Sequence, residues 1–247
     1  VHTPIQAIDE VAAKYRQDGK AEVNAKYAAM VESVDDACRS VLETLESLNL
    51  LENTVIIFTS DNGGLDGRGR PTENAPLRSG KGYPYEGGIR VPMLVRWPDK
   101  VTAGTVSDEP VCSIDLLPTI ARIAGVALDD AIEIDGIELN DLLMGKTKSL
   151  SRDRLSWHFP HYRHAPGPYS IIRQGDWKLI HYYEGIQELY NLKDDLGESR
   201  DLARERPEKV SALEKTLMAD LRAMGARLPR PNPNYKPRRP KPAKPKK

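Results

Sequence analysis

An acidic residue and an amide residue stand together just after an apolar stretch of the chain. Residues 55–58 are apolar and mostly β-branched, and Asp61 and Asn62 follow after two polar residues. In an open α/β sheet, ligands bind beyond the carboxyl ends of the strands. A carboxylate and an amide oxygen placed there suit a hard cation such as Ca²⁺ or Mg²⁺. For the pair taken alone, an Asx turn closed by Gly63 is the simpler alternative.

A lysine between two glycines follows twenty residues later. Lys81 is flanked by Gly80 and Gly82 in a long loop that is rich in glycine, proline and charge. Glycine lets the backbone come close to a ligand, and long loops in compact domains are usually functional. These features favour an anion-binding lysine over a solvated loop lysine.

Five segments in this order resemble the sulfatase family of the alkaline phosphatase superfamily, of the arylsulfatase type. They are HTP at 2–4, NTVIIFTSDNGG at 53–64, PLRSGKGYPYEGGIRVP at 76–92, QGDWKL at 174–179 and ELYNL at 188–192, continued by DLGE at 195–198. The resemblance covers about residues 1–205. It implies a sulfuric ester hydrolase that acts on a sulfated small molecule or carbohydrate.

The resemblance also implies roles for individual residues. Asp61 and Asn62 match the later pair of calcium ligands in the family, Lys81 matches the lysine that holds the sulfate, and His2 matches the histidine beside the ester oxygen. A cation and an ammonium stabilise the charge that grows on the peripheral sulfate oxygens, and a protonated His or Lys can protonate the leaving alcohol. His2 and Lys81 are thus the catalytic candidates, and Arg78 is a further candidate for substrate binding.

The sequence departs from the family pattern at the nucleophile. Sulfatases use a formylglycine made in a Cys-x-Pro-x-Arg motif, and neither Cys38 nor Cys112 lies in such a motif. The early acidic pair of calcium ligands is also absent, and residues 35–36 cannot replace it because neighbouring helical residues diverge by about 100°. The chain begins with Val1 rather than Met. We therefore expect the C-terminal part of a sulfatase, with an incomplete Ca²⁺ site, the formylglycine upstream and no activity on its own.

Two other functions remain open at this point. One is a related phosphoester or phosphonate hydrolase of the same superfamily. The other is a truncated, non-catalytic remnant that binds anions or polysaccharide. The absence of the nucleophile from this chain favours the remnant, whereas the loop lysine favours the sulfatase.

The periodicity of apolar residues predicts an α/β fold in two parts. Amphipathic helices are expected at 20–50, 113–125 and 207–225, because apolar residues recur there at steps of three and four. The apolar runs at 55–60 and 91–97 predict strands buried on both faces of a mixed, mostly parallel sheet flanked by helices. Short strands at 169–173, 177–183 and 187–191 predict a small antiparallel sheet. The expected units are therefore 1–155, the C-terminal part of the α/β catalytic domain; 156–228, the small sheet with a helix; and 229–247, a disordered basic, proline-rich tail.

Three histidines lie close together near the boundary between these parts. His158, His161 and His164 are spaced by three residues, but Pro160 interrupts any helix and no partner Cys or Glu stands at ligand spacing, which argues against zinc. The segment is interpreted as a crossover between the two parts. The alternative is a lining of the substrate entrance, since His, Trp and Arg suit sulfated sugars.

The charge of the chain is unevenly distributed. Residues 229–247 hold eight Lys or Arg and no acid, which leaves 28 basic and 36 acidic residues, a net charge of about −8, for the body. An acidic body argues against nucleic acid as a partner. No run of eighteen apolar residues is present, so no transmembrane helix is expected. The family resemblance implies a periplasmic or secreted protein.

Overall fold

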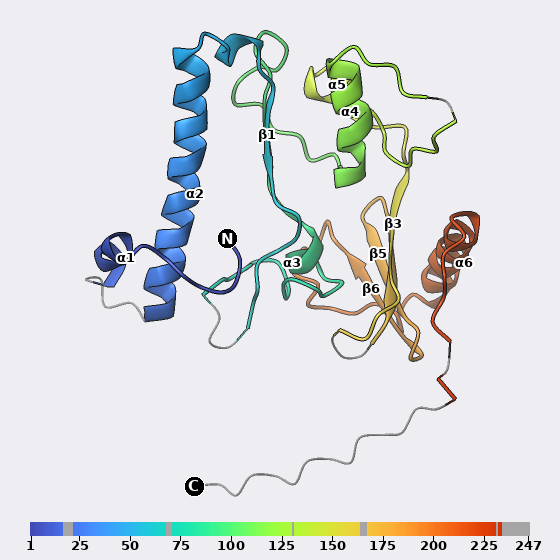
Figure 1. Cartoon of the computed structure of the whole chain (residues 1–247). Coiled ribbons are helices and arrows are strands. Elements are labelled where there is room, and N and C mark those ends of the chain that lie inside the picture. Colours follow the sequence, from blue (N-terminus) through green and yellow to red (C-terminus); the bar gives the residue numbers. More distant parts are fainter. Residues whose placement is uncertain (17–21, 68–70, 130, 164–166, 231, 234–247) are drawn as a thin grey trace, which may run out of the picture.

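The fold consists of a two-stranded sheet with helices and a four-stranded sheet with helices. A computed structural model describes residues 1–16, 22–67, 71–129, 131–163, 167–230 and 232–233 (Figure 1). The helices are α1 Asp9–Arg16, α2 Glu22–Ser47, α3 Glu86–Ile89, α4 Leu116–Ile123, α5 Asn140–Leu143 and α6 Pro207–Ala223, with short 3₁₀ helices at Leu51–Asn53 and Ser113–Asp115. The strands are β1 Ile56–Thr59, β2 Met93–Arg96, β3 Arg154–Phe159, β4 Tyr169–Gln174, β5 Trp177–Tyr182 and β6 Ile186–Asn191. The α/β class expected from the sequence is confirmed.

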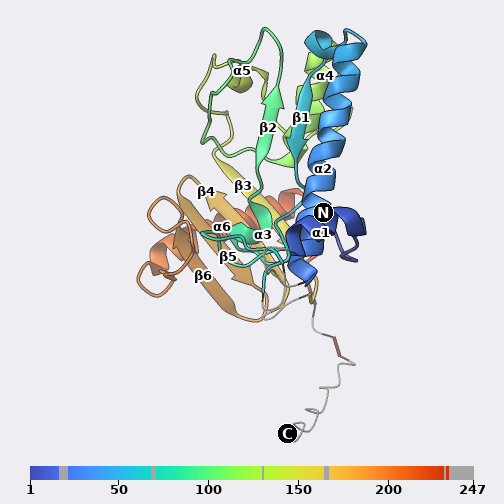
Figure 2. The ribbon, with the colours of Figure 1, turned by 90° about the vertical axis from the view of Figure 1, so that its left-hand side faces the viewer.

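The first sheet differs from the expected parallel arrangement. Strands β1 and β2 lie side by side and pair antiparallel, with Phe58 opposite Leu94 (Figure 2). No parallel pair occurs in the part of the chain that the structure describes. An apolar run predicts a strand but not its direction, which here is set by the long loop that turns the chain back from β1 to β2.

The expected burial of these strands on both faces is wrong for the chain as described. Phe58 is 44% exposed and Leu94 is 65% exposed. Helices α2 and α4 stand on opposite sides of β1 (Figure 1), yet the apolar stripe predicted on α2 is also largely open. Val34 and Val41 are exposed, and the buried residues of α2 are Ala25 and Ala29 near α1.

The second sheet is an antiparallel meander in the order β3-β4-β5-β6. Three of its strands match the sequence prediction, and β3 was not expected. Side chains alternate between the two faces of a strand. One face, with Ile171, Ile180, Tyr182 and Tyr190, packs against Tyr85 of the loop between β1 and β2. The other face packs against α6, which covers Ile172, Leu179 and Leu189 with Val210, Leu213, Leu217 and Leu221 (Figure 1).

The loop before β2 therefore packs on the four-stranded sheet rather than lying free. Strand β3 begins at Arg154, next to residue 155, where the sequence predicts the boundary between the two parts of the chain. The position of this boundary stays a prediction. Most of the predicted tail at 229–247 lies outside the described residues. Among the helices of the described chain, none combines the length and apolar character that a membrane crossing needs.

Candidate functional site

The turn after β1 and the loop that carries Lys81 lie against each other. The backbone N–H of Lys81 donates to the carbonyl of Gly64 at 2.9 Å, and the N–H of Gly63 donates to the carbonyl of Gly88 at 3.1 Å. These two hydrogen bonds join segments about twenty residues apart in sequence. They bring the Asp61–Asn62 turn and the lysine loop next to each other.

Two glycines make this close approach possible. A Cβ atom at Gly63 would lie 1.8 Å from the carbonyl oxygen of Gly87, and one at Gly80 would lie 2.2 Å from the carbonyl oxygen of Gly64. Both neighbours are backbone atoms, which cannot rotate away. The two segments can therefore touch only where side chains are absent.

Replacement of Gly63 by alanine is expected to separate the two segments. The added methyl group forces the backbone at Gly87 to move, and overpacking of this kind costs about 1–3 kcal/mol of folding stability. Thermal or urea unfolding of this chain measures the loss. Gly197→Ala is the matched control, because the nearest atom to a Cβ there is the Pro76 oxygen at 3.1 Å. Equal stabilities of the two variants would contradict the proposed close contact.

The side chain of Asn74 forms hydrogen bonds with both the segment after β1 and the lysine loop. Sequence analysis did not identify this residue. Its Nδ2 donates to the carbonyls of Gly64 at 3.0 Å and Ser79 at 2.8 Å, while its Oδ1 accepts from the Gly64 N–H at 3.2 Å. Ser79 has a φ of 58°, in the left-handed region that non-glycine residues rarely adopt. Such a conformation persists only where surrounding contacts determine it. No motif signals this role, because it depends on how the loop folds back.

Lys81 and His2 meet although 79 positions separate them. The Nζ atom of Lys81 lies 3.1 Å from Nε2 of His2, and Nδ1 of His2 lies 2.7 Å from the carbonyl oxygen of Thr3. A carbonyl can only accept, so Nδ1 carries the proton and the Nε2 lone pair accepts from the ammonium. His2 is exposed and Lys81 is half-buried, so a ligand can reach both. The two residues singled out as catalytic candidates thus form one polar pair.

Asp61 and Asn62 are free to bind a ligand. Asp61 is exposed and Asn62 is half-buried, and within the described ranges neither side chain makes a hydrogen bond or an ion pair. Their oxygens are of the type that Ca²⁺ binds, which fits the predicted ligand role, but Ca²⁺ takes six to eight ligands. No group of three or more His, Cys, Asp or Glu in the described residues could hold a metal. These two residues can therefore supply only part of such a site.

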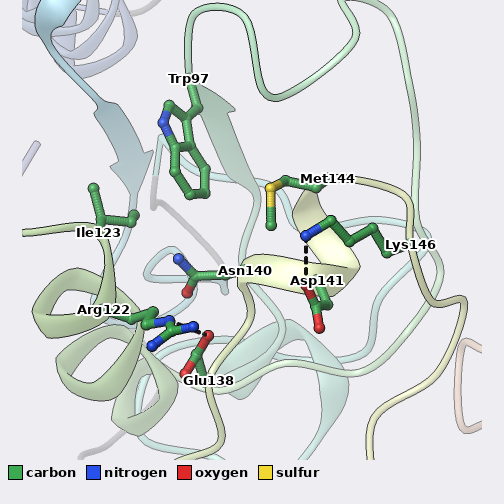
Figure 3. A pocket seen from close by; sticks show the side chains of 8 residues that line it. All are labelled: Trp97, Arg122, Ile123, Glu138, Asn140, Asp141, Met144 and Lys146. Carbon is green, nitrogen blue, oxygen red and sulfur yellow. Dashed lines mark ion pairs between the residues drawn. The ribbon is translucent and has the colours of Figure 1, made fainter. Parts of the chain in front are cut away.

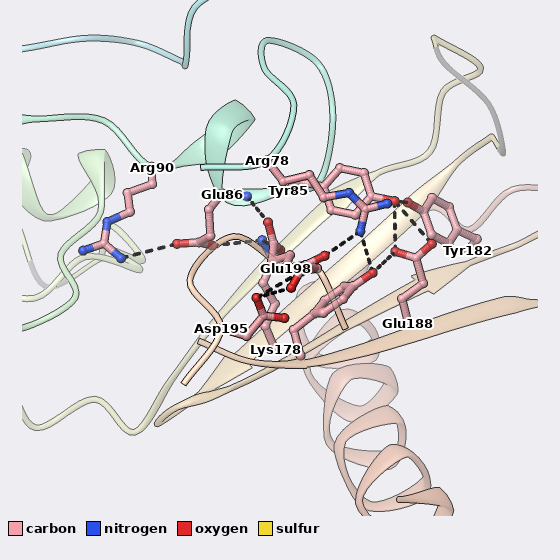
Figure 4. A network of polar contacts seen from close by, with 11 residues as sticks. Arg78, Tyr85, Glu86, Arg90, Lys178, Tyr182, Glu188, Asp195 and Glu198 are labelled. Atoms are coloured by element: carbon pink, nitrogen blue, oxygen red, sulfur yellow. Dashed lines mark hydrogen bonds and ion pairs between the residues drawn. The ribbon is translucent and has the colours of Figure 1, made fainter. Parts of the chain in front are cut away.

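Arg78 has partners other than Lys81 and His2. Its Nη1 donates to the hydroxyl of Tyr190 at 2.8 Å and to the carbonyl of Glu198 at 2.8 Å, and its guanidinium lies 3.8 Å from the centroid of the Tyr85 ring. These contacts join the lysine loop to the four-stranded sheet (Figure 4). They favour a positioning function for Arg78, and its assignment to substrate binding stays a prediction.

The histidine segment belongs to the sheet and its edge. His158, on β3, lies 2.8 Å from Ser170 Oγ and 3.1 Å from the carbonyl of Arg227. His161 is exposed and packs edge-on against Phe159, at 5.2 Å between ring centroids. His164 lies outside the described residues. His158 thus connects the sheet with the chain that follows α6.

A polar hollow of about 260 Å³ lies elsewhere, next to β2, α4 and α5 (Figure 3). Its charged residues pair with each other: Arg122 lies 3.7 Å from Glu138, and Lys146 lies 3.2 Å from Asp141. It contains none of the residues that the sequence motifs identify. The Asp61–Lys81–His2 group therefore remains the candidate site.

Comparisons with known proteins agree with the motifs of the site. Residues 1–126 match the family described as Sulfatase, and residues 80–226 match the family described as N-sulphoglucosamine sulphohydrolase, C-terminal. The chain is 38% identical over 229 residues to a protein named sulfatase from Formosa agariphila, covering 84% of this chain and 41% of that protein.

Solved structures share the fold. The structure described as Ps i-CgsB in complex with k-i-k-neocarrahexaose has a TM-score of 0.76 and 30% identity, covering 90% of this chain and 47% of that chain. A second, BT4656 in complex with its substrate D-glucosamine-2-N,6-O-disulfate, has a TM-score of 0.65 and 25% identity, covering 87% of this chain and 45% of that chain. The present chain therefore spans less than half the length of these relatives.

Proposed function

Because the chain belongs to the sulfatase family, we propose that it is the C-terminal part of an enzyme that hydrolyses sulfuric esters. The observation that carries this proposal is the 3.1 Å contact between Lys81 and His2, next to the Asp61–Asn62 turn. His2, the Asp61–Asn62 turn and Lys81 come from three separate segments of the chain. The resemblance of each segment to the family predicts a role in the same sulfate site.

The chain's own residues have distinct functions in the proposed reaction. The Lys81 ammonium binds a peripheral sulfate oxygen and stabilises the negative charge that grows there as the S–O bond breaks. The proton shared between Lys81 Nζ and His2 Nε2 is available to the bridging oxygen of the leaving alcohol, beside which the family resemblance puts His2. Asp61 and Asn62 would hold Ca²⁺, which would supply positive charge that stabilises the sulfate group as the S–O bond breaks.

The rest of the proposed site comes from the longer parent protein. A formylglycine there would supply the nucleophile that attacks sulfur, and further acidic residues would complete the Ca²⁺ site. The apolar surface of this chain supports the proposal, since Phe58 and Leu94 form an exposed cross-strand pair and Leu117 and Ile120 of α4 are at least half exposed. Further polypeptide packed on these side chains would remove them from water. The chain by itself is then inactive.

Sulfated carbohydrates are the proposed substrates. This proposal is supported by the two structural relatives, whose descriptions name a neocarrahexaose and a glucosamine disulfate. The exposed His161 beside Phe159 is consistent with sulfated carbohydrates as substrates, because aromatic rings can stack on sugars and an imidazole can form hydrogen bonds with them. The family resemblance further supports a periplasmic or secreted location for the parent.

Activity measurements on the full-length parent and on the present chain test the proposed function. We expect the parent to release sulfate from 4-nitrophenyl sulfate and from sulfated glucosamine, to lose this activity with a calcium chelator and to regain it with Ca²⁺. The present chain should release none. The controls are 4-nitrophenyl phosphate and a phenyl phosphonate ester, and faster hydrolysis of either would favour the related hydrolase instead. Binding of sulfated sugar without any hydrolysis by the parent would favour the non-catalytic remnant.

A further inference from the structure

Three charged side chains are buried together beneath the lysine loop. Lys178 of β5 and Glu198 are each 0% exposed, and Glu86 of α3 is 2% exposed. The Nζ atom of Lys178 lies 2.9 Å from Glu86 Oε1 and 2.8 Å from Glu198 Oε1. The contact with Glu198 is a close ion pair without hydrogen-bond geometry. Burial raises the pKa of the Glu198 carboxyl, although the Lys178 ammonium opposes this rise.

This buried group holds the first residue of α3 in two ways. Glu198 Oε2 accepts the backbone N–H of Glu86 at 2.6 Å, and Lys178 donates to the Glu86 side chain at 2.9 Å (Figure 4). Glu198 itself has a φ of 50°, a conformation that persists only where its surroundings determine it. Contacts with Lys178 of β5 and with Glu198 thus fix the position of Glu86.

The next two residues of α3, Gly87 and Gly88, form hydrogen bonds with the segments of the candidate site. The N–H of Gly87 donates to the carbonyl of Arg78 at 2.9 Å, and the carbonyl of Gly88 accepts from Gly63 at 3.1 Å. Gly63 directly follows the Asp61–Asn62 turn. One short helix therefore contacts the chain just before Lys81 and the chain just after the proposed metal ligands.

Arg78 adds a second link between the loop and the sheet. Its guanidinium donates to the hydroxyl of Tyr190 on β6 and to the carbonyl of Glu198, the same residue that binds Glu86. The loop is therefore tied to the sheet at residues 78 and 86, on both sides of Lys81.

Stability alone does not account for this arrangement. Replacing a buried ion pair by apolar residues of similar size is often neutral or stabilising, because the cost of removing charges from water offsets their attraction. An apolar contact, however, is not directional, whereas the present group fixes a backbone N–H and a side chain in one geometry. The arrangement is therefore better explained by the orientation of the loop that it determines.

We infer that Lys178, held between Glu86 and Glu198, is a positioning residue that fixes the Lys81 loop against the Asp61–Asn62 turn. The catalytic consequence of this inference rests on the proposed function, whereas the positioning of the loop by Lys178 does not depend on that function. Reacting groups must be held close to their productive geometry, and a displacement of about 1 Å caused far from the chemistry can cost about a hundredfold in rate.

Hydrogen exchange on the present chain tests the structural part. We expect Lys178→Met, which keeps the length of the side chain but removes its charge, to increase exchange at the amides of Gly63, Lys81 and Gly87 by at least tenfold. Asp220→Asn is the matched control, since it breaks the Arg154–Asp220 ion pair at 2.9 Å between β3 and α6 without touching the loop. This control should leave those three amides unchanged.

Kinetics of the full-length parent test the catalytic part. Lys178→Met should lower kcat for a sulfate ester by about tenfold to a hundredfold, change KM by less than threefold, and weaken Ca²⁺ binding measured by calorimetry. Asp220→Asn should lower the melting temperature but keep kcat. A purely structural function of Lys178 would lower the melting temperature in the same way and leave kcat and Ca²⁺ affinity of the folded enzyme intact, which would overturn the inference.

A milder variant covers the case in which Lys178→Met does not fold. Glu198→Gln keeps the size of the side chain and an oxygen that can accept the Glu86 N–H, so its effects on exchange and kcat should have the same direction and be smaller. Unchanged exchange at Gly63 and Lys81 in the folded variant would contradict the inference. If the unaltered parent hydrolyses no sulfate ester, the proposed function fails, while the exchange experiment still decides whether Lys178 positions the loop.

Discussion

Replacement of Lys81 by alanine in the full-length parent is expected to lower kcat by about a hundredfold to a thousandfold, the usual effect of removing one donor that stabilises transition-state charge. In the proposed reaction this lysine supplies the ammonium at the sulfate oxygens, and in the structure its Nζ atom lies 3.1 Å from Nε2 of His2. Its side chain makes no buried ion pair in the described structure, so the fold should survive the change. Steady-state kinetics with an aryl sulfate, together with the melting temperature, measure both expectations.

Lys146→Ala is the matched control for this experiment. Lys146 is 62% exposed, pairs with Asp141 and lines the hollow next to α5, which is not the candidate site. Its removal should leave kcat unchanged. Normal turnover of the Lys81 variant would exclude this lysine from the sulfate site and would remove the main support for the proposed function.

Replacement of Asp61 by alanine in the parent is expected to abolish Ca²⁺ binding and activity together. Asp61 is exposed and has no ion-pair partner among the residues that the structure describes, so its removal costs little stability in the metal-free protein. A carboxylate ligand is among the strongest contributors to a Ca²⁺ site because it brings a full negative charge. Calorimetric titration with Ca²⁺ measures the binding, and sulfate release measures the activity.

Asp176→Ala is the matched control, because Asp176 is also an exposed carboxylate in a turn after a strand. This variant should bind Ca²⁺ as the unaltered parent does. Unchanged metal content in the Asp61 variant would refute the ligand assignment. Loss of activity with full metal content would instead indicate that Asp61 acts on the substrate.

Several features of this protein were determined by local sequence. The alternation of side chains in β4, β5 and β6 and the apolar steps in α6 depend only on the repeat of each element, and these elements were predicted correctly. The candidate site residues also lie in segments that the sequence alone identifies, because the Asp61–Asn62 turn, the glycine-flanked lysine and the histidine each belong to a recognisable motif. Their roles stay predictions.

Tertiary structure decided the features that depend on partners distant in sequence. The direction of β2, the exposure of the stripe on α2 and the contacts of Arg78 depend on what lies next to each element, and local periodicity does not contain this information. A lysine on the buried face of β5 was the only local sign of the group formed by Glu86, Lys178 and Glu198. A buried charge requires partners, but only the folded chain determines that they come from residues 92 and 20 positions away.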